Sequence, residues 1–228
     1  MKLRSTLRRW HIWLGWLVGV PLLFWTLSGF FMVLKPIEEV RGETLLSPEP
    51  QPVLERTPLL PATMSGETTL QLVQRHRGLY WVLNGDTLID ASAGRRAEPF
   101  SAENARAEVA ARYIGTSPIA SVAAIDPADP PIDWRRDTPA WKVETEDGTR
   151  FYVERDTGRI AAVRTGWWRA FDFMWGLHIM DLQTREHISN NWVRVFSALS
   201  LVTVLMALVL LPLSQWRRRR RPRPARDV

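Results

Sequence analysis

Two apolar stretches of membrane-spanning length flank the polar middle of this chain and constrain its fold more than any other feature. The first covers residues 12–34 and the second covers residues 193–213. An α-helix needs about 20 apolar residues to cross roughly 30 Å of hydrocarbon. Neither stretch has a charged residue in its interior, apart from Arg194 at the start of the second. Because a charge at mid-bilayer is costly, both stretches are predicted to be transmembrane helices.

The first stretch differs from a cleaved signal peptide. Its apolar core exceeds the usual ~7–15 residues, and no small-residue cleavage motif follows it. We therefore predict that this helix stays in the chain and ends at Lys35-Pro36. The chain is then a membrane protein whose polar domain lies between two anchors.

Basic residues are concentrated just outside the two predicted helices. Four precede the first helix, and seven follow the second between Arg217 and Arg226. The positive-inside tendency predicts that both termini lie in the cytoplasm. Residues 36–192 carry 17 Lys and Arg against 23 Asp and Glu, so no basic, aromatic surface there indicates nucleic-acid binding.

The chain has no cysteine. Disulfide bonds, thiolate metal sites and the C-x-x-C-H attachment of c-type haem are therefore excluded. The sequence also lacks the nucleophile elbow, the H-E-x-x-H zinc helix, the phosphate-binding loop and the dinucleotide motif G-x-G-x-x-G. Hydrolytic or nucleotide-dependent catalysis is not expected, and any chemistry would come from a bound cofactor.

The first part of the middle segment combines a spacer with short elements. Residues 46–61 hold five prolines, which predict a stiff, extended spacer. A short helix is predicted over residues 68–77, where Leu70 and Val73 share one side. Residues 79–89 predict a β-hairpin, because Asn84-Gly85 readily supplies the two positive φ angles of a type I′ turn.

The second part of the middle segment predicts one helix and a sheet. Ser101 is expected to cap a helix that continues to Gly115. Strands are predicted over residues 122–125, 141–146, 150–154 and 160–164. Apolar and charged residues alternate in them, which predicts an antiparallel sheet with one face covered by the helix. The fold class is therefore an α+β domain, an antiparallel sheet with a helix, between two transmembrane α-helices.

Three groups of residues carry a family resemblance. They are the run Trp10 to Gly15 with Gly19, Pro21, Trp25, Ser28-Gly29 and Pro36, then Trp141 to Gly158, and then Trp175 to Asp181. In this order, these motifs resemble the PepSY-associated transmembrane family. The resemblance covers most of the chain outside the spacer and the arginine-rich tail.

The resemblance implies a bacterial inner-membrane protein with a PepSY-like domain in the periplasm. It assigns residues 1–11 to a cytoplasmic N-terminus, 12–34 to the first transmembrane helix, 35–66 to the spacer, 67–166 to the PepSY-like domain, 167–192 to an interfacial segment, 193–213 to the second transmembrane helix and 214–228 to a cytoplasmic tail. Some larger relatives, with four membrane helices, are similar to haem-containing reductases of ferric siderophores, which act in iron uptake. This chain has two spans.

His11 is the first candidate haem ligand. His11, Gly15 and Gly19 are spaced four residues apart and so share one face of the first helix. A histidine beside two glycines allows a flat porphyrin to lie against the helix while the imidazole ligates iron. The same spacing also fits close packing of a neighbouring helix, with His11 at the membrane surface.

His178 and His187 are the other candidate ligands. On one straight helix, nine residues would place them on opposite faces, so they could share a metal only from separate segments. Asp181 is expected either to orient the His178 ring or to pair with Arg185. The alternative for both histidines is an ordinary position at the membrane surface.

A haem site would need more than one chain. His11 and His178 are predicted near opposite membrane surfaces, too far apart to hold one iron. A second ligand to b-type haem would then come from another copy of the chain, as a homodimer, or from a partner membrane subunit. Two copies packed along Gly15 and Gly19, and along Ser197 and Ser200, would carry electrons across the bilayer to an acceptor such as a ferric siderophore.

A second hypothesis belongs to another class. The chain would be a non-catalytic, membrane-anchored regulatory module whose PepSY-like domain binds a peptide, a peptidase or another periplasmic protein. Trp134, in the loop of residues 126–139, is then a candidate contact, unless it covers the sheet edge. His76, between two arginines, is expected to be a solvated surface residue.

Overall fold

The computed structural model describes residues 2–61 and 69–219, and side chains within residues 5–61 and 69–212. The chain divides into two compact units. Residues 1–34 and 171–228 form one, called here the helical unit. Residues 35–170 form the other, called the sheet unit.

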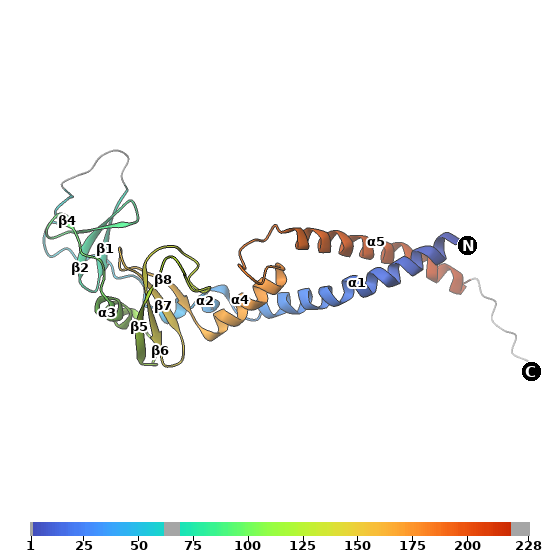
Figure 1. Ribbon diagram of the computed structural model, residues 1–228, viewed down its shortest axis with the longest axis horizontal. Coiled ribbons are helices and arrows are strands. Elements are labelled where there is room, and N and C mark those ends of the chain that lie inside the picture. The colour runs from blue at the N-terminus through green and yellow to red at the C-terminus, as the bar shows by residue number, and fades with distance from the viewer. Residues whose placement is uncertain (1, 62–68, 220–228) are drawn as a thin grey trace, which may run out of the picture. The chain divides into compact units, whose positions relative to one another are not determined.

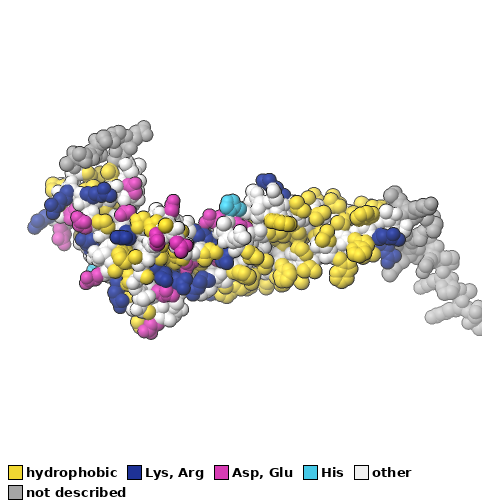
Figure 2. Space-filling model, viewed as in Figure 1, with side chains coloured by type: hydrophobic (Ala, Val, Ile, Leu, Met, Phe, Trp, Pro, Cys, Tyr) yellow, Lys and Arg dark blue, Asp and Glu magenta, His cyan; other side chains and the backbone are white. Residues whose placement is uncertain are grey.

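In the helical unit, α1 (Lys2–Met32) and α5 (Asn191–Arg219) lie side by side (Figure 1). Within them, Ser5–Met32 and Asn191–Pro212 are long and apolar enough to cross a membrane. Figure 2 shows apolar side chains covering the outside of this helix pair. Leu17, for example, is 63% exposed and Leu201 is 60% exposed. Helices with outward-facing apolar side chains suit lipid as their solvent, which agrees with the two predicted transmembrane helices.

The sheet unit contains two four-stranded antiparallel sheets and one longer helix. After α2 (Ile37–Val40) and the 3₁₀ helix η1 (Glu43–Leu45), the first sheet has the order β1 (Leu70–Arg75), β2 (Gly78–Leu83), β3 (Thr87–Asp90), β4 (Arg95–Arg96). The helix α3 (Ala102–Arg112) follows. The second sheet has the order β5 (Ile119–Ile125), β6 (Ala140–Thr145), β7 (Arg150–Glu154), β8 (Ile160–Arg164). The predicted α+β domain between two membrane helices is therefore confirmed.

Local sequence signals explain several of these elements. Asn84 and Gly85 have φ angles of 52° and 84°, and the N–H of Asp86 donates to the carbonyl of Leu83 at 3.2 Å. The predicted turn between β2 and β3 is therefore confirmed. Ser101 caps α3, since its Oγ accepts a hydrogen bond from the N–H of Asn104 at 3.2 Å.

The helix predicted over residues 68–77 is wrong. Residue 68 lies outside the described residues, and Leu70–Arg75 forms β1, an edge strand that pairs with β2 from Leu70↔Leu83 to Arg75↔Gly78. Gly78 has a φ of 146°, which allows the tight return of the chain. The spacing of two apolar residues favoured a helix, but backbone pairing with the adjacent strand decides the outcome.

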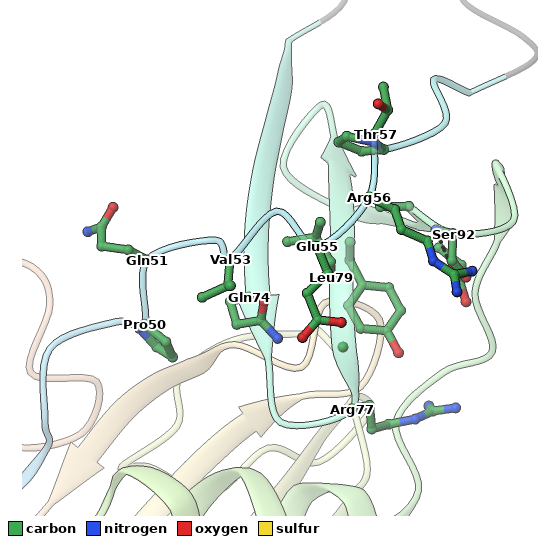
Figure 3. Close-up of a pocket in the computed structure, with 15 residues that line it drawn as sticks. Pro50, Gln51, Val53, Glu55, Arg56, Thr57, Gln74, Arg77, Leu79 and Ser92 are labelled. Carbon is green, nitrogen blue, oxygen red and sulfur yellow. Dashed lines mark hydrogen bonds between the residues drawn. The ribbon is translucent and has the colours of Figure 1, made fainter.

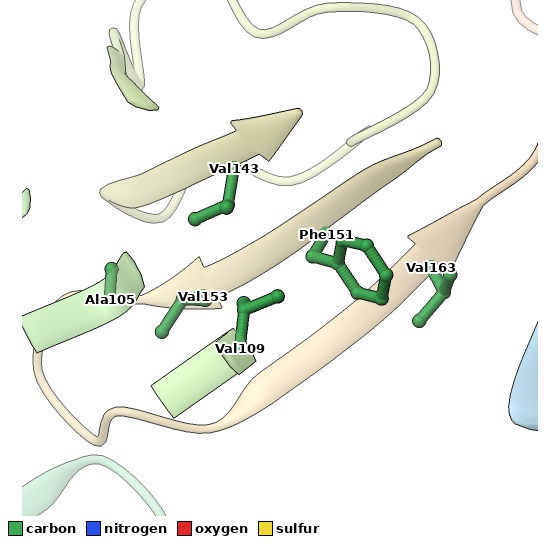
Figure 4. Close-up of a cluster of buried hydrophobic side chains, with 6 residues drawn as sticks. All are labelled: Ala105, Val109, Val143, Phe151, Val153 and Val163. Atoms are coloured by element: carbon green, nitrogen blue, oxygen red, sulfur yellow. The ribbon is translucent and has the colours of Figure 1, made fainter. Parts of the chain in front are cut away.

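The main core of the sheet unit lies between α3 and the second sheet. Ala105 and Val109 of α3 pack against apolar side chains of the strands, as Figure 4 shows for Val143, Phe151, Val153 and Val163. Val109, Val143 and Phe151 are fully buried. The predicted packing of the capped helix on a sheet face is confirmed.

The other face of the second sheet is also covered, by the loop whose Trp134 was expected either to contact a partner or to cover the sheet edge. Trp134 is 1% exposed, and its ring stacks on that of Tyr152 at a centroid distance of 5.1 Å. The Trp134 Nε1–H donates to the carbonyl of Thr138 at 3.1 Å. Both faces of β7 are therefore buried, and Trp134 is a core residue, not a partner contact.

Candidate functional site

The best-defined polar contact of the helical unit joins His178 to α1. His178 is the last residue of α4 (Gly166–His178). Its Nδ1 lies 3.0 Å from Ser28 Oγ and 3.1 Å from the carbonyl oxygen of Trp25. Its ring stacks on the Trp25 indole, with centroids 4.5 Å apart and planes 21° apart. The imidazole is therefore fixed in both position and plane.

Gly29 allows this close approach. A Cβ at Gly29 would lie 3.2 Å from His178 Cε1, which is tighter than ordinary van der Waals contact. Ser28, next to it, is completely buried. The Ser28-Gly29 pair thus forms the surface of α1 on which His178 rests.

The contacts of His178 also determine its tautomer. A carbonyl oxygen only accepts hydrogen bonds, so the Nδ1 atom that contacts Trp25 must carry the proton. Ser28 Oγ itself donates to the same carbonyl at 2.8 Å and can accept from Nδ1–H. In neutral imidazole the lone pair is then on Nε2, which has no hydrogen-bond partner among the described residues. Metal-binding histidines are commonly held in this way, with one ring N–H on a carbonyl and the other nitrogen on the metal.

Asp181 organises the loop between α4 and α5. Its carboxylate accepts from the N–H groups of Thr184, Glu186 and His187 and from the Thr184 hydroxyl. The Thr184 hydrogen bond is the largest of the causes that lower the pKa of Asp181 below its usual value. The expected pairing with Arg185 is wrong, because Arg185 forms an ion pair with buried Asp172. The contacts of Asp181 run to His187, not to the ring of His178.

His187 lies in this loop and not on α4. Its side chain is 75% exposed, and Nδ1 lies 3.0 Å from Thr184 Oγ and 3.6 Å from Asp181 Oδ2. His178 and His187 therefore belong to separate segments. This is the arrangement in which the two histidines could share one metal. Their role as ligands stays a prediction.

His11 is a partly buried residue of α1. Its Nδ1 is shielded from solvent and has no hydrogen-bond partner among the described residues. A Cβ at Gly15 or Gly19 would meet no described atom within 4 Å, and the surface at these two glycines is called here the open face of α1. His11 and Ser28 are 17 residues apart along α1, which corresponds to ~25 Å. His11 and His178 therefore belong to different levels of the helix pair.

The residues around Trp134 form a buried hydrogen-bonded network. Asp133 is 3% exposed and accepts hydrogen bonds from Tyr152 Oη at 2.7 Å and Arg150 Nη1 at 3.0 Å. Burial alone would raise the pKa of Asp133, but these two donors lower it below its usual value. This arrangement holds the loop to the sheet. His76 is exposed, as predicted.

Sequence reasoning missed the partners of His178. Ser28-Gly29 was noticed as part of a motif, but 150 residues separate Ser28 from His178. Among the described residues, no group of three or more His, Cys, Asp and Glu side chains is arranged to hold a metal ion.

Comparison with known proteins gives one positive result. The family described as PepSY-associated TM region matches residues 8–227 of the chain. No curated protein and no solved structure gives a significant match.

Proposed function

The chain belongs to the PepSY-associated TM region family, and on this premise we propose that it binds b-type haem and carries electrons across a bacterial inner membrane. Its termini lie in the cytoplasm and its sheet unit lies in the periplasm. The electrons serve an iron-uptake reaction, the reduction of a ferric siderophore. The single observation that carries this proposal is the contact of His178 Nδ1 with Ser28 and the Trp25 carbonyl, which leaves Nε2 without a hydrogen-bond partner among the described residues.

His178 supports haem binding through its unused nitrogen. Ser28 and Trp25 hold the proton on Nδ1, so Nε2 presents a lone pair. The stack on Trp25 fixes the plane of the ring. A bound haem supplies reversible one-electron chemistry, with a potential that its axial ligands help to set. In this proposal the chain orients the His178 imidazole that ligates the iron and excludes water from it.

His11 supports a second haem position at the other end of α1. Its buried Nδ1 lacks a partner, and the adjoining Gly15 and Gly19 leave the helix backbone uncovered. Either a flat macrocycle or a second helix would fit such a face. His11 and His178 lie at different levels of α1, so neither is the second ligand of the other, and a second ligand comes from another copy or from a partner membrane subunit.

The orientation follows from charge. Basic residues precede the Ser5–Met32 span, and Arg217, Arg218 and Arg219 end α5. Further arginines from residue 220 onward lie outside the described residues. Cytoplasmic termini satisfy the positive-inside tendency at both ends.

An absorption spectrum of the purified full chain tests the proposal. Protein from haem-replete cells, solubilised in detergent, should show a Soret band that sharpens and shifts on reduction with dithionite. His178→Ala and His11→Ala should each remove part of the band, whereas the matched control His76→Ala, at an exposed position, should leave it intact. A wild-type chain without a Soret band would refute haem binding and leave the membrane-anchored regulatory module as the better hypothesis.

A further inference from the structure

The backbone of the proline-rich spacer is hydrogen-bonded to the sheet unit at its two ends. At its start, the Ser47 N–H donates to the carbonyl of Arg112 at 2.8 Å. At its end, Leu59 donates to the carbonyl of Ala91 at 2.8 Å and accepts from Trp81 Nε1 at 2.9 Å. Residues 48–58, called here the bow, have no backbone hydrogen bond to other described residues. The side chain of Glu49 holds the start of the bow to the sheet unit, since its Oε1 lies 3.7 Å from Arg75 Nη1 and 3.5 Å from Arg112 Nη1.

A cavity lies between the bow and the first sheet. Its volume is about 670 Å³, within the range of roughly 300–1,000 Å³ that is usual for ligand sites. Figure 3 shows the bow opposite Gln74 and Leu79 of the β1–β2 hairpin, with Ser92 at another edge of the cavity. All of these residues belong to the sheet unit. The cavity is therefore formed within one compact unit.

The charges that line the cavity are balanced. Glu55 and Arg56 lie on the bow, Arg77 lies in the β1–β2 turn, and Asp90 ends β3. Asp90 Oδ1 accepts hydrogen bonds from the N–H and the hydroxyl of Ser92, at 2.7 and 2.6 Å. Two anionic side chains would repel a polyanion, and four charged side chains would be desolvated by a purely apolar ligand. A ligand with charges of both signs suits this lining best.

The bow also offers backbone groups. Val53 to Thr57 are five consecutive residues with N–H groups, and none of these groups has a hydrogen-bond partner among the described residues. Pro50, Pro52 and Pro58 flank them and favour an extended chain. The segment bends at Glu55 and Arg56. Free donors and acceptors of this kind can pair with an extended chain, which is how many peptides bind at a strand edge.

We propose that this cavity binds an extended peptide of mixed charge, which pairs with the backbone of Val53 to Thr57 and contacts Glu55, Arg77 and Asp90 with its side chains. The apolar part of the floor, at Leu79, receives an apolar side chain of the ligand. The site lies wholly in the sheet unit and does not depend on haem.

Hydrogen exchange on the full chain in lipid nanodiscs tests the site. The probes are a tryptic digest of casein, which supplies short peptides, and intact casein, which supplies the same sequences within a long unfolded chain. Either probe should slow exchange of the amides of residues 53–57 at least about tenfold, because free amides become paired. Protection by the digest alone would assign the site to free peptides, and protection by both would extend it to protein segments. No protection by either would overturn the proposal.

Matched variants separate the site from general effects. Glu55→Pro removes one donor from the bow, and Glu98→Pro makes the same change in an exposed irregular segment outside the cavity. Arg77→Glu reverses a charge in the cavity, and Arg96→Glu does so on β4. The two cavity variants should weaken binding of the digest at least tenfold, and the two controls should not. Equal binding by a variant and its control would refute the site, whereas loss of the Soret band in His178→Ala should leave peptide protection unchanged.

Discussion

The sheet unit and the helical unit reach stability by opposite arrangements of apolar side chains. In the sheet unit, Phe151, Val143 and Val109 are fully enclosed by protein. In the helical unit, Ser28 and Val18 are buried, but most large apolar side chains of α1 and α5 face outward. The sheet unit therefore has its own core, whereas the helical unit needs lipid, or another helix, to cover its surface.

The difference affects what a polar contact means in each unit. Tyr152, Asp133 and Arg150 form one of many hydrogen-bonded groups in the sheet unit. In the helical unit, His178 on Ser28 is one of few side-chain contacts between separate segments. In hydrocarbon, a polar side chain without a partner is costly. Such contacts in the helical unit therefore indicate specific structure or function more strongly.

Removing core volume should show the largest difference between the units. Phe151→Ala should destabilise the sheet unit by about 3–5 kcal/mol, because it leaves a cavity among fully buried neighbours. Leu23→Ala, at a side chain 57% exposed in α1, should change stability by about 0.5 kcal/mol or less. Pulse proteolysis of the full chain in urea measures both. Similar losses in the two variants would contradict the proposed contrast between the units.

The elements that were predicted correctly depend on short-range signals. The Asn84-Gly85 turn and the Ser101 cap are decided within a few residues, by backbone conformation and one hydrogen bond. The two membrane helices depend on composition alone. Each of these could be found without knowledge of the rest of the fold.

The features that were missed depend on distant residues. β1 forms because the chain returns as β2, and Trp134 is buried because the second sheet offers it an uncovered face. His178 contacts Ser28, which lies 150 residues earlier in the sequence. No local pattern specifies such pairs, so the histidine was found as a candidate but its orienting partners were not.

Breaking the Asp133 network should have the second largest effect. Asp133→Ala leaves the Tyr152 hydroxyl and the Arg150 guanidinium without their acceptor, and should cost about 2–3 kcal/mol. The pKa of Asp133 is lowered in the folded chain, so its contribution is complete above the ordinary aspartate pKa and is lost as the pH falls through the folded value. Urea unfolding should be measured from pH 6 to pH 3. The free energy of unfolding should fall less steeply with acid in Asp133→Asn than in the wild type. An unchanged profile would refute this assignment.

The same substitution at two serines compares polar contacts in the two units. Ser101→Ala removes the α3 cap and should cost about 1 kcal/mol. Ser28→Ala should cost roughly 0.6 kcal/mol, because the Trp25 carbonyl still accepts from His178. NMR of ¹⁵N-labelled histidine, with four histidines in the chain, should show the Nδ1–H tautomer for His178 in the wild type. The Nε2–H tautomer would contradict both the hydrogen bond to Trp25 and the haem proposal.

The smallest effect on the stability of a single chain is expected at Gly15. The Cβ of a leucine there would meet no described atom of its own chain within 4 Å, so Gly15→Leu should leave the unfolding of one chain unchanged. Gly29→Leu is the matched control, because its Cβ would press on the His178 ring and displace it. If the open face of α1 binds haem or a second copy, Gly15→Leu should weaken the Soret band or the dimer, measured by absorption and by native mass spectrometry in detergent. If it changes neither, the face contacts only lipid, and the helical unit is complete as a two-helix anchor.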